Sequence, residues 1–376
     1  MTDILSIWTI DLMFVLAVSI FCSGIVIPQI LLIAFRFNMF DNPDPRKIHQ
    51  GAVPRLGGLA FMPVVFFSVA LMLGIKIFIG DFNFIQMVGG DLRAIASSVC
   101  AMMLIYVVGM GDDLIGVRYK TKFVMQILCA LMLIGGGLWL NNLWDLFGIN
   151  EISVWVGVPL TVMVIVFIVH SINLIDGIDG LASGLSSIVM IIYAFSFVML
   201  GEYVCALLAI ATLGVLVSFF YYNVFGDPNK MHKIFMGDTG SLTIGMLICI
   251  LGLKLVNPIH ELDFDWIPNR LVIVFSPLIV PCFDVVRVYL YRVRNHRNPF
   301  MPDKNHIHHK LLALGLPQRS AMVTIVLISL AFTSANILVS LVLNINWILL
   351  IDIVVWTLGN LWLAKTIRRK RKESKR

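Results

Sequence analysis

Long apolar stretches follow one another along this chain, and they limit what it can fold into more than any other feature does. A helix needs about 20 apolar residues to cross the hydrocarbon core of a bilayer. Continuous apolar runs do not alternate as the strands of a membrane barrel must, so we expect helices. Eleven stretches qualify as membrane-spanning helices: 11–35, 57–79, 93–110, 123–141, 153–171, 183–200, 204–222, 240–256, 270–291, 321–342 and 347–364.

The composition excludes several other classes of protein. Of the 376 residues, 59% are hydrophobic and 13% are charged, whereas soluble domains are about 45–50% apolar and about 25% charged. An ordinary cytosolic enzyme, a disordered chain and a disulfide-stapled secreted domain are therefore excluded. The formal charge of +6 is carried by the tail 366–376, so we expect no nucleic-acid partner. The six cysteines stand singly in apolar runs and are interpreted as small buried side chains.

The basic residues lie almost entirely in every second connection. The connections 36–56, 111–122, 172–182, 223–239 and 292–320, together with the C-terminal tail 365–376, hold 23 of the 28 Lys and Arg residues. The positive-inside rule therefore predicts that these connections and the C-terminus face the cytoplasm, and that the N-terminus is outside. We expect one all-α polytopic membrane bundle over 1–365, followed by a basic cytoplasmic tail over 366–376.

Unusual polar residues gather in these same connections, although polar groups at membrane depth are costly. The first group lies within 41–58 and contains Arg46, Lys47, His49 and Arg55 among several prolines and glycines. Its basic side chains suit phosphate binding. A loop that only sets the orientation of the chain is an equally good explanation.

Two adjacent carboxylates, Asp112 and Asp113, follow an apolar stretch and precede Lys122. Like charges this close repel each other, so they need a cation, a metal ion or a shared proton. A solvated helix end is the alternative. The flanking glycines and the basic residues that follow favour a site for a diphosphate and a metal ion.

A third group contains Asn173, Asp176 and Asp179, which are spaced by three residues, so a helical turn would bring them to one side. The connection 172–182 contains no Lys or Arg. A divalent cation or a donor-rich ligand would offset the cost of two acids there. A purely structural role is the alternative.

Two further groups complete the set. Asp238 precedes the stretch 240–256 and is either a hard oxygen ligand for Mg²⁺ or a plain helix N-cap. Phe235 is either a core side chain or a platform for a base. His306, His308 and His309 suit phosphate oxygens better than zinc, because adjacent ligands seldom all reach one ion. The five groups together suit Mg²⁺ and a diphosphate, and the chain lacks the GxxxxGK[ST] pattern of a P-loop.

With these residues the chain resembles the polyprenyl-phosphate N-acetylhexosamine-1-phosphate transferases over nearly its whole length. Four motifs carry the resemblance: Gly111-Asp112-Asp113, Asn173-Leu174-Ile175-Asp176-Gly177-Ile178-Asp179-Gly180-Leu181, Phe235-Met236-Gly237-Asp238-Thr239-Gly240-Ser241 and His306-Ile307-His308-His309. The basic residues of 46–58 and the order of the histidines resemble the branch that uses N-acetylglucosamine (GlcNAc). The resemblance implies transfer of an N-acetylhexosamine 1-phosphate, with GlcNAc the leading choice, from a UDP-sugar to undecaprenyl phosphate, with release of UMP.

The resemblance also implies roles for single residues. Asp238 and Asn173 would bind Mg²⁺, with Mn²⁺ as the other candidate, and Asp112 and Asp113 would position the acceptor or take its proton. Together with Asp238, these two form the expected catalytic set. The expected substrate-binding residues are Lys122, Asp176, Asp179, Phe235, Asn223, Lys47, His49, His306, His308 and His309. One departure from the family pattern is His170, where many relatives have Asn.

Such an enzyme would be a multi-pass protein of the bacterial cytoplasmic (inner) membrane with its active site on the cytoplasmic face. Its lipid-linked product would start the synthesis of a cell-envelope polysaccharide. The sequence is compatible with a homodimer and does not determine the oligomeric state. The chemistry would be a single in-line displacement, with a two-step route through an aspartyl-phosphate as the alternative. The rival function is a transporter or lipid flippase. Transporters place ionisable groups near the midplane and often have inverted repeats, and the sequence shows neither.

Overall fold

The structure is a computed structural model that describes residues 2–40, 53–80, 92–257, 268–298 and 305–373. Lys47 and His49 lie outside the described residues. The helices are α1 Thr2–Arg36, α2 Phe61–Ile79, α4 Leu92–Ile115, α5 Tyr119–Gly135, α6 Val154–Ile175, α7 Leu181–Leu200, α8 Tyr203–Phe220, α9 Gly237–Val256, α10 Arg270–Phe275, α11 Ile279–Arg294, α12 Ile307–Ala313, α13 Gln318–Val339 and α14 Ile345–Glu373. Two short strands, β1 Asn142–Leu146 and β2 Ile149–Glu151, accompany them.

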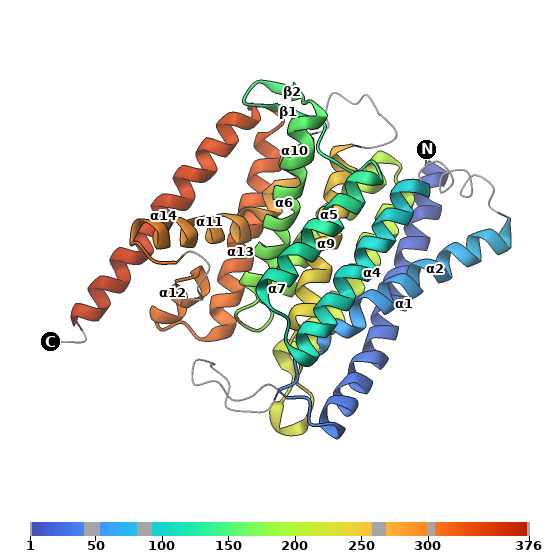
Figure 1. The fold of residues 1–376 in the computed structure, drawn as a ribbon, viewed down its shortest axis with the longest axis horizontal. Helices are drawn as coiled ribbons and strands as arrows, with labels where there is room; N and C mark the ends of the chain where they lie inside the picture. Colours follow the sequence, from blue (N-terminus) through green and yellow to red (C-terminus); the bar gives the residue numbers. More distant parts are fainter. Residues whose placement is uncertain (1, 41–52, 81–91, 258–267, 299–304, 374–376) are drawn as a thin grey trace.

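The predicted all-α polytopic membrane fold is confirmed. Ten helices of the described ranges are long and apolar enough to cross a membrane. The stretch 123–141, expected as an eleventh span, forms the shorter helix α5, which has 17 residues and ends at Gly135. Helix α5 packs between α4 and α6, so it belongs to the same bundle as the ten longer helices (Figure 1).

Helix α9 lies at the centre of the bundle. All its residues from Thr239 to Val256 are buried, and it packs against α4, α6 and α7. The close approach of α4 depends on Gly109, because a Cβ there would overlap the backbone of Thr239. On the other side, the Gly58 amide donates to the Met236 carbonyl at 2.8 Å. These contacts hold the N-terminus of α9 against α4 and against the turn that begins α2.

The stretch 270–291, expected as one continuous span, lies within Arg270–Arg294, one of the ten candidate spans, but a 3-10 turn interrupts its helix in the middle. Helix α10 ends at Phe275, a 3-10 turn containing Pro277 follows, and α11 begins at Ile279. A proline has no N–H to donate to the preceding turn of a helix, which is why the helix bends here. Figure 1 shows α11 running across the direction of α6 and α13, with α12 beside it.

A β-hairpin that the sequence analysis did not predict closes the end of the bundle opposite the N-terminus of α9 (Figure 1). Its strands are antiparallel, with Asn142 paired to Glu151 and Leu146 to Ile149. The Asn269 side chain, just before α10, donates to the Trp144 carbonyl at 2.6 Å. The N-terminus lies toward the hairpin end and the C-terminus toward the other end.

Candidate active site

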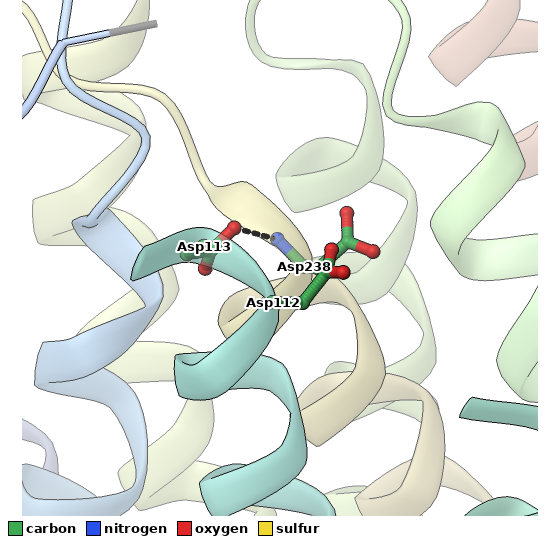
Figure 2. Close-up of side chains that lie close together, drawn as sticks. All are labelled: Asp112, Asp113 and Asp238. Atoms are coloured by element: carbon green, nitrogen blue, oxygen red, sulfur yellow. Dashed lines mark hydrogen bonds between the residues drawn. The ribbon is translucent and has the colours of Figure 1, made fainter. Parts of the chain in front are cut away.

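Polar side chains from four connections meet at the end of the bundle where α9 begins. Three carboxylates form the centre of this site: Asp112 and Asp113 from the last turns of α4, and Asp238 from the first turn of α9. One oxygen of each lies within 4.8 Å of the others. Figure 2 shows Asp112 and Asp238 side by side, with Asp113 turned toward the backbone of α9.

Asp113 caps the N-terminus of α9. Its two oxygens accept hydrogen bonds from the amides of Asp238 and Thr239, each at 2.8 Å, and from the Thr239 hydroxyl at 2.5 Å. The first amides of a helix have no partner within the helix and carry its positive dipole end, so a carboxylate there is stabilised. Gly237 makes room for it: this residue has φ +72°, and a Cβ would overlap the Asp113 carboxylate.

Asp112 and Asp238 share a cation instead. The Lys122 ammonium from α5 lies 2.8 Å from Asp112 and 2.5 Å from Asp238. The other Asp112 oxygen accepts the Val117 amide at 2.7 Å. The side chains of all three charged residues keep a fraction of their surface exposed, between 15% and 27%, so a substrate can reach them. The two carboxylates thus form a site that requires positive charge.

The donor set fits the Mg²⁺ that the sequence analysis expects. Mg²⁺ prefers oxygen ligands from one or two carboxylates together with substrate phosphates. Asp112 and Asp238 supply such oxygens, whereas the Asp113 oxygens are already used by α9. Asn173, at the end of α6, lies against Asp238 and donates to the Ser241 hydroxyl at 2.8 Å. An ion held by Asp112 and Asp238 would have Asn173 as a neighbour.

The loop after α6 is tied to the segment before α9. Asp179 pairs with Lys233 at 2.6 Å. Asn223 accepts the Gly180 amide at 2.6 Å and donates to the Ile234 carbonyl at 2.8 Å. Asn223 therefore joins two parts of the site through its amide group, and its predicted contact with the uracil stays a prediction.

Two other predicted substrate-binding residues border this loop. Asp176 is exposed at the end of α6. Phe235 is half-buried, and its amide donates to the Pro54 carbonyl at 2.9 Å. The ring of Phe235 lies 6.0 Å from the Lys233 ammonium, next to the ion pair with Asp179. The stacking role of Phe235 stays a prediction.

A cavity of about 790 Å³ lies near the carboxylate site, because His170, which lines it, interacts electrostatically with Lys122 and Asp238. His308 and His309 of α12 line it together with His306, the residue before α12, and His170 lines it from α6. Most of its wall is apolar and comes from α5, α6 and α11: Phe123, Ile127, Pro159, Val162, Met163, Val166, Phe167, Leu174, Val285 and Val288. The cavity therefore has an apolar body and a polar end made of histidines.

His308 connects α12 to the loop after α6. Its ring lies against Gly177, where a Cβ would overlap it. Burial, with the neighbouring His309 and His306, lowers the pKa of His308 to about 3. The Nδ1 atoms of His308 and His170 are buried without a hydrogen-bond partner among the described residues.

Sequence reasoning missed one residue of this region, Asp284 of α11. Its carboxylate is fully buried and contacts His306, Arg287 and the start of α12. A signal was present, because Asp284 is the single acidic residue of the apolar stretch 270–291, and an ionisable residue inside a span is a functional candidate by default.

Comparison with known proteins identifies the family. Residues 95–256 match the sequence profile of glycosyl transferase family 4, a first indication that this polytopic membrane protein is a glycosyl transferase. A probable undecaprenyl-phosphate N-acetylglucosaminyl 1-phosphate transferase of Bacillus subtilis (strain 168) is 33% identical over 90% of this chain and 88% of its own. The chain therefore belongs to the polyprenyl-phosphate N-acetylglucosamine-1-phosphate transferases of this family, as the motifs indicated.

Two other relatives extend the comparison. The decaprenyl-phosphate N-acetylglucosaminephosphotransferase of Mycolicibacterium smegmatis (strain ATCC 700084 / mc(2)155) is 29% identical, over 79% of this chain and 74% of its own. The undecaprenyl-phosphate alpha-N-acetylglucosaminyl 1-phosphate transferase of Escherichia coli (strain K12) is 27% identical, over 81% and 78%. The three names share one transferred group and one class of lipid acceptor.

Proposed function

We propose that this protein transfers GlcNAc 1-phosphate from UDP-GlcNAc to undecaprenyl phosphate, forming the lipid-linked diphospho-sugar and releasing UMP. The observation that carries the proposal is the group Asp112, Lys122 and Asp238, which comes from three helices and lies near an apolar cavity. The names of the relatives support the transferred sugar phosphate and the polyprenyl acceptor. A UDP-sugar is the donor that the family implies.

The cavity suits the acceptor. Its apolar wall along α5, α6 and α11 provides a surface for a prenyl chain, and its histidine end provides hydrogen-bond donors for a phosphate. His170 and Phe123 line the cavity beside Lys122. An acceptor whose chain fills the cavity would therefore present its phosphate to the group Asp112, Lys122 and Asp238.

The reaction is a displacement at phosphorus. An oxygen of the acceptor phosphate forms a bond to the sugar-bearing phosphorus of the donor, and the bond from that phosphorus to the UMP oxygen breaks. Mg²⁺, when bound at Asp112 and Asp238, supplies positive charge to the diphosphate. Lys122 adds a second positive charge where negative charge spreads during transfer. Most of the acceptor phosphate is already dianionic at pH 7, because its second pKa is about 6.

The position of the site supports a location on the cytoplasmic face of the bacterial inner membrane. The carboxylates, Lys122 and the histidines all belong to connections that carry the excess of Lys and Arg. Juxtamembrane basic residues are retained on the cytoplasmic side. UDP-sugars are made in the cytoplasm, so this orientation brings the donor to the site.

The test uses purified protein, radiolabelled UDP-GlcNAc and undecaprenyl phosphate in detergent. We expect a labelled lipid product and UMP in equal amounts, loss of both with EDTA, and recovery with added Mg²⁺. Asp238→Ala should lower turnover at least about 100-fold, because it removes a charged group of the reacting site. Product formed at the same rate in EDTA would reject the metal. Uptake of UDP-GlcNAc into vesicles without any labelled lipid would favour the transporter instead.

A further inference from the structure

The first turn of α13 contains an arginine whose contacts lie outside that helix. Arg319 is exposed at the start of α13. A cation in the first turn is unfavourable for a helix, because the N-terminal end of the helix dipole is itself positive. The Arg319 guanidinium donates a hydrogen bond to the Val224 carbonyl at 3.0 Å and lies over the Phe225 ring, 5.4 Å from its centroid. Arg319 therefore interacts with the segment that follows α8.

This segment, Tyr221–Phe225, continues α8 as a short π-helix. Such π-helices are rare and are frequent at functional sites. The last carbonyls of a helix have no partner within the helix, and they carry the negative end of its dipole. An arginine that donates to the Val224 carbonyl both satisfies this oxygen and places positive charge at the favourable end. Arg319 thus fixes the end of the π-helix.

Asn223, the residue before Val224, joins two loops of the site. Its side-chain oxygen accepts the Gly180 amide at 2.6 Å, and its amide group donates to the Ile234 carbonyl at 2.8 Å. Gly180 has φ +77°, and a Cβ there would overlap the side chains of Val224 and Phe220. The loop after α6 therefore lies directly against the π-helix, and a shift of the π-helix would disturb both loops.

The two loops carry residues that are expected to bind substrate. Asp179 precedes Gly180 and pairs with Lys233 at 2.6 Å. Phe235, the expected platform for the base, follows Ile234. The residues that line the apolar cavity include neither Arg319 nor any residue of the π-helix. A change at Arg319 should therefore affect the nucleotide of the donor and not the prenyl chain of the acceptor.

We infer that Arg319 is a positioning residue for the donor nucleotide. It fixes the end of the π-helix, so that Asn223 holds the loop after α6 and the segment before α9 at the separation that the nucleotide requires. The inference rests on the proposed function, which supplies the UDP-sugar. Arg319 contacts no reacting atom in this role, so its loss should weaken donor binding and leave the displacement at phosphorus nearly unchanged.

The first experiment separates donor binding from turnover. In Arg319→Gln, the KM for UDP-GlcNAc should rise about 5- to 20-fold, because a hydrogen bond from a charged donor is lost. The kcat and the KM for undecaprenyl phosphate should stay within about 2-fold of the wild type. Arg319→Lys keeps a cation but loses the planar group over Phe225, so its KM should lie between the two. Equilibrium dialysis with radiolabelled UDP should show the same order of affinities without turnover.

Arg368→Gln is the matched control. Arg368 is an exposed arginine of α14 that makes no hydrogen bond or ion pair within the described residues, so both KM values should stay as in the wild type. A merely structural role of Arg319 would lower the Tm and the kcat and leave the KM for UDP-GlcNAc unchanged. That result, or the same donor KM in Arg319→Gln and Arg368→Gln, would overturn the inference.

Hydrogen exchange measures the contact itself and needs no substrate. Peptides that cover 176–182 and 221–236 should exchange faster in Arg319→Gln than in the wild type, whereas peptides of α1 should not change. Equal exchange of the two loops in both proteins would contradict the role of Arg319.

The two proposals fail in different ways. A wild-type protein that forms no labelled lipid refutes the proposed function, while UDP binding and hydrogen exchange still decide the role of Arg319. An active enzyme whose donor KM does not change in Arg319→Gln refutes only the inference.

Discussion

Asp112 and Asp113 are neighbours in the sequence, but their carboxylates face different partners. Asp113 accepts the first amides of α9, whereas Asp112 pairs with Lys122 of α5. A carboxylate at a helix N-terminus adds stability to the fold. The Asp112 carboxylate, which shares Lys122 with Asp238, is one of the groups that would hold the proposed metal ion. The two residues should therefore respond differently to substitution.

Alanine at each position separates stability from catalysis. Asp113→Ala should lower the unfolding free energy by about 1–2 kcal/mol, because α9 loses its cap, and activity should fall with it. Asp112→Ala should lower kcat at least about 100-fold while the Tm stays near that of the wild type. Thermal unfolding in detergent and the transferase assay measure the two effects. A wild-type Tm for Asp113→Ala would show that the cap contributes no stability.

His308 gives the folded protein a sensitivity to acid. Burial beside His309 and His306 lowers the pKa of His308 to about 3 in the folded state, whereas an unfolded histidine has a pKa of about 6.5. The unfolded state therefore takes up the proton first as the pH falls. The stability that neutral His308 contributes is complete above about pH 6.5 and is lost progressively as the pH falls toward 3.

The difference should be visible in thermal unfolding at two pH values. Between about pH 7 and pH 5, the Tm of the wild type should fall more than the Tm of His308→Gln, because glutamine does not titrate. His232→Gln, at an exposed histidine, is the control and should keep the wild-type slope. Parallel slopes for the wild type and His308→Gln would contradict a lowered pKa at His308.

At the scale of helices, the site depends on how closely α4 and α9 approach. Gly109 of α4 lies against the backbone of Thr239, three residues before Asp112 on the same helix. Any side chain at Gly109 pushes the two helices apart, because backbone atoms cannot move aside as a flexible side chain can. Such a shift would also separate Asp112 from Asp238, which lie on those two helices.

A glycine pair tests this packing. Gly109→Ala should cost about 1–3 kcal/mol of stability by overpacking and should lower transferase activity. Gly74→Ala, in α2, meets nothing within 4 Å and should be neutral or stabilising by up to about 1 kcal/mol, since alanine is the better helix former. Unfolding midpoints and activity of both variants are the measurement. Equal stability of the two variants would show that α4 tolerates a larger separation from α9.

At the scale of the whole molecule, the bundle places its polar chemistry at one end and the β-hairpin at the other (Figure 1). The carboxylate site lies at the end where α9 begins, and the predicted orientation puts that end in the cytoplasm. The donor and the acceptor headgroup would then meet on the cytoplasmic side. The orientation is a prediction from charge and has its own test.

Reporter fusions test the orientation in bacterial cells. A green fluorescent protein fused after Arg376 should fluoresce. This reporter folds in the cytoplasm, but it does not fold when it is exported through the general secretion route. Alkaline phosphatase inserted at Gly148, at the tip of the hairpin, should be active, because this enzyme needs an oxidising compartment for its disulfides. The reverse pattern would place the active site outside and refute the cytoplasmic reaction.

The candidate site residues could be predicted from the sequence, because the energetic cost of a polar residue beside an apolar stretch does not depend on its tertiary partners. Acids beside long apolar stretches, such as Asp112 and Asp238, are expensive wherever they lie and therefore point to function. Substrate-binding roles were predicted for Lys47 and His49 as well, but these two residues lie outside the described residues. Asp284 was missed because one acid in an apolar stretch resembles an isolated polar residue until its partners are known.

The amino-acid sequence by itself determined the helical membrane fold, the polar end of the bundle and the family, since length, hydropathy and motif order are properties of the chain alone. Tertiary structure decided which carboxylate caps α9, which pair shares Lys122, and where Pro277 turns α11 so that Asp284 meets His306. Those assignments depend on distances between helices far apart in the sequence, and short-range patterns do not encode such distances.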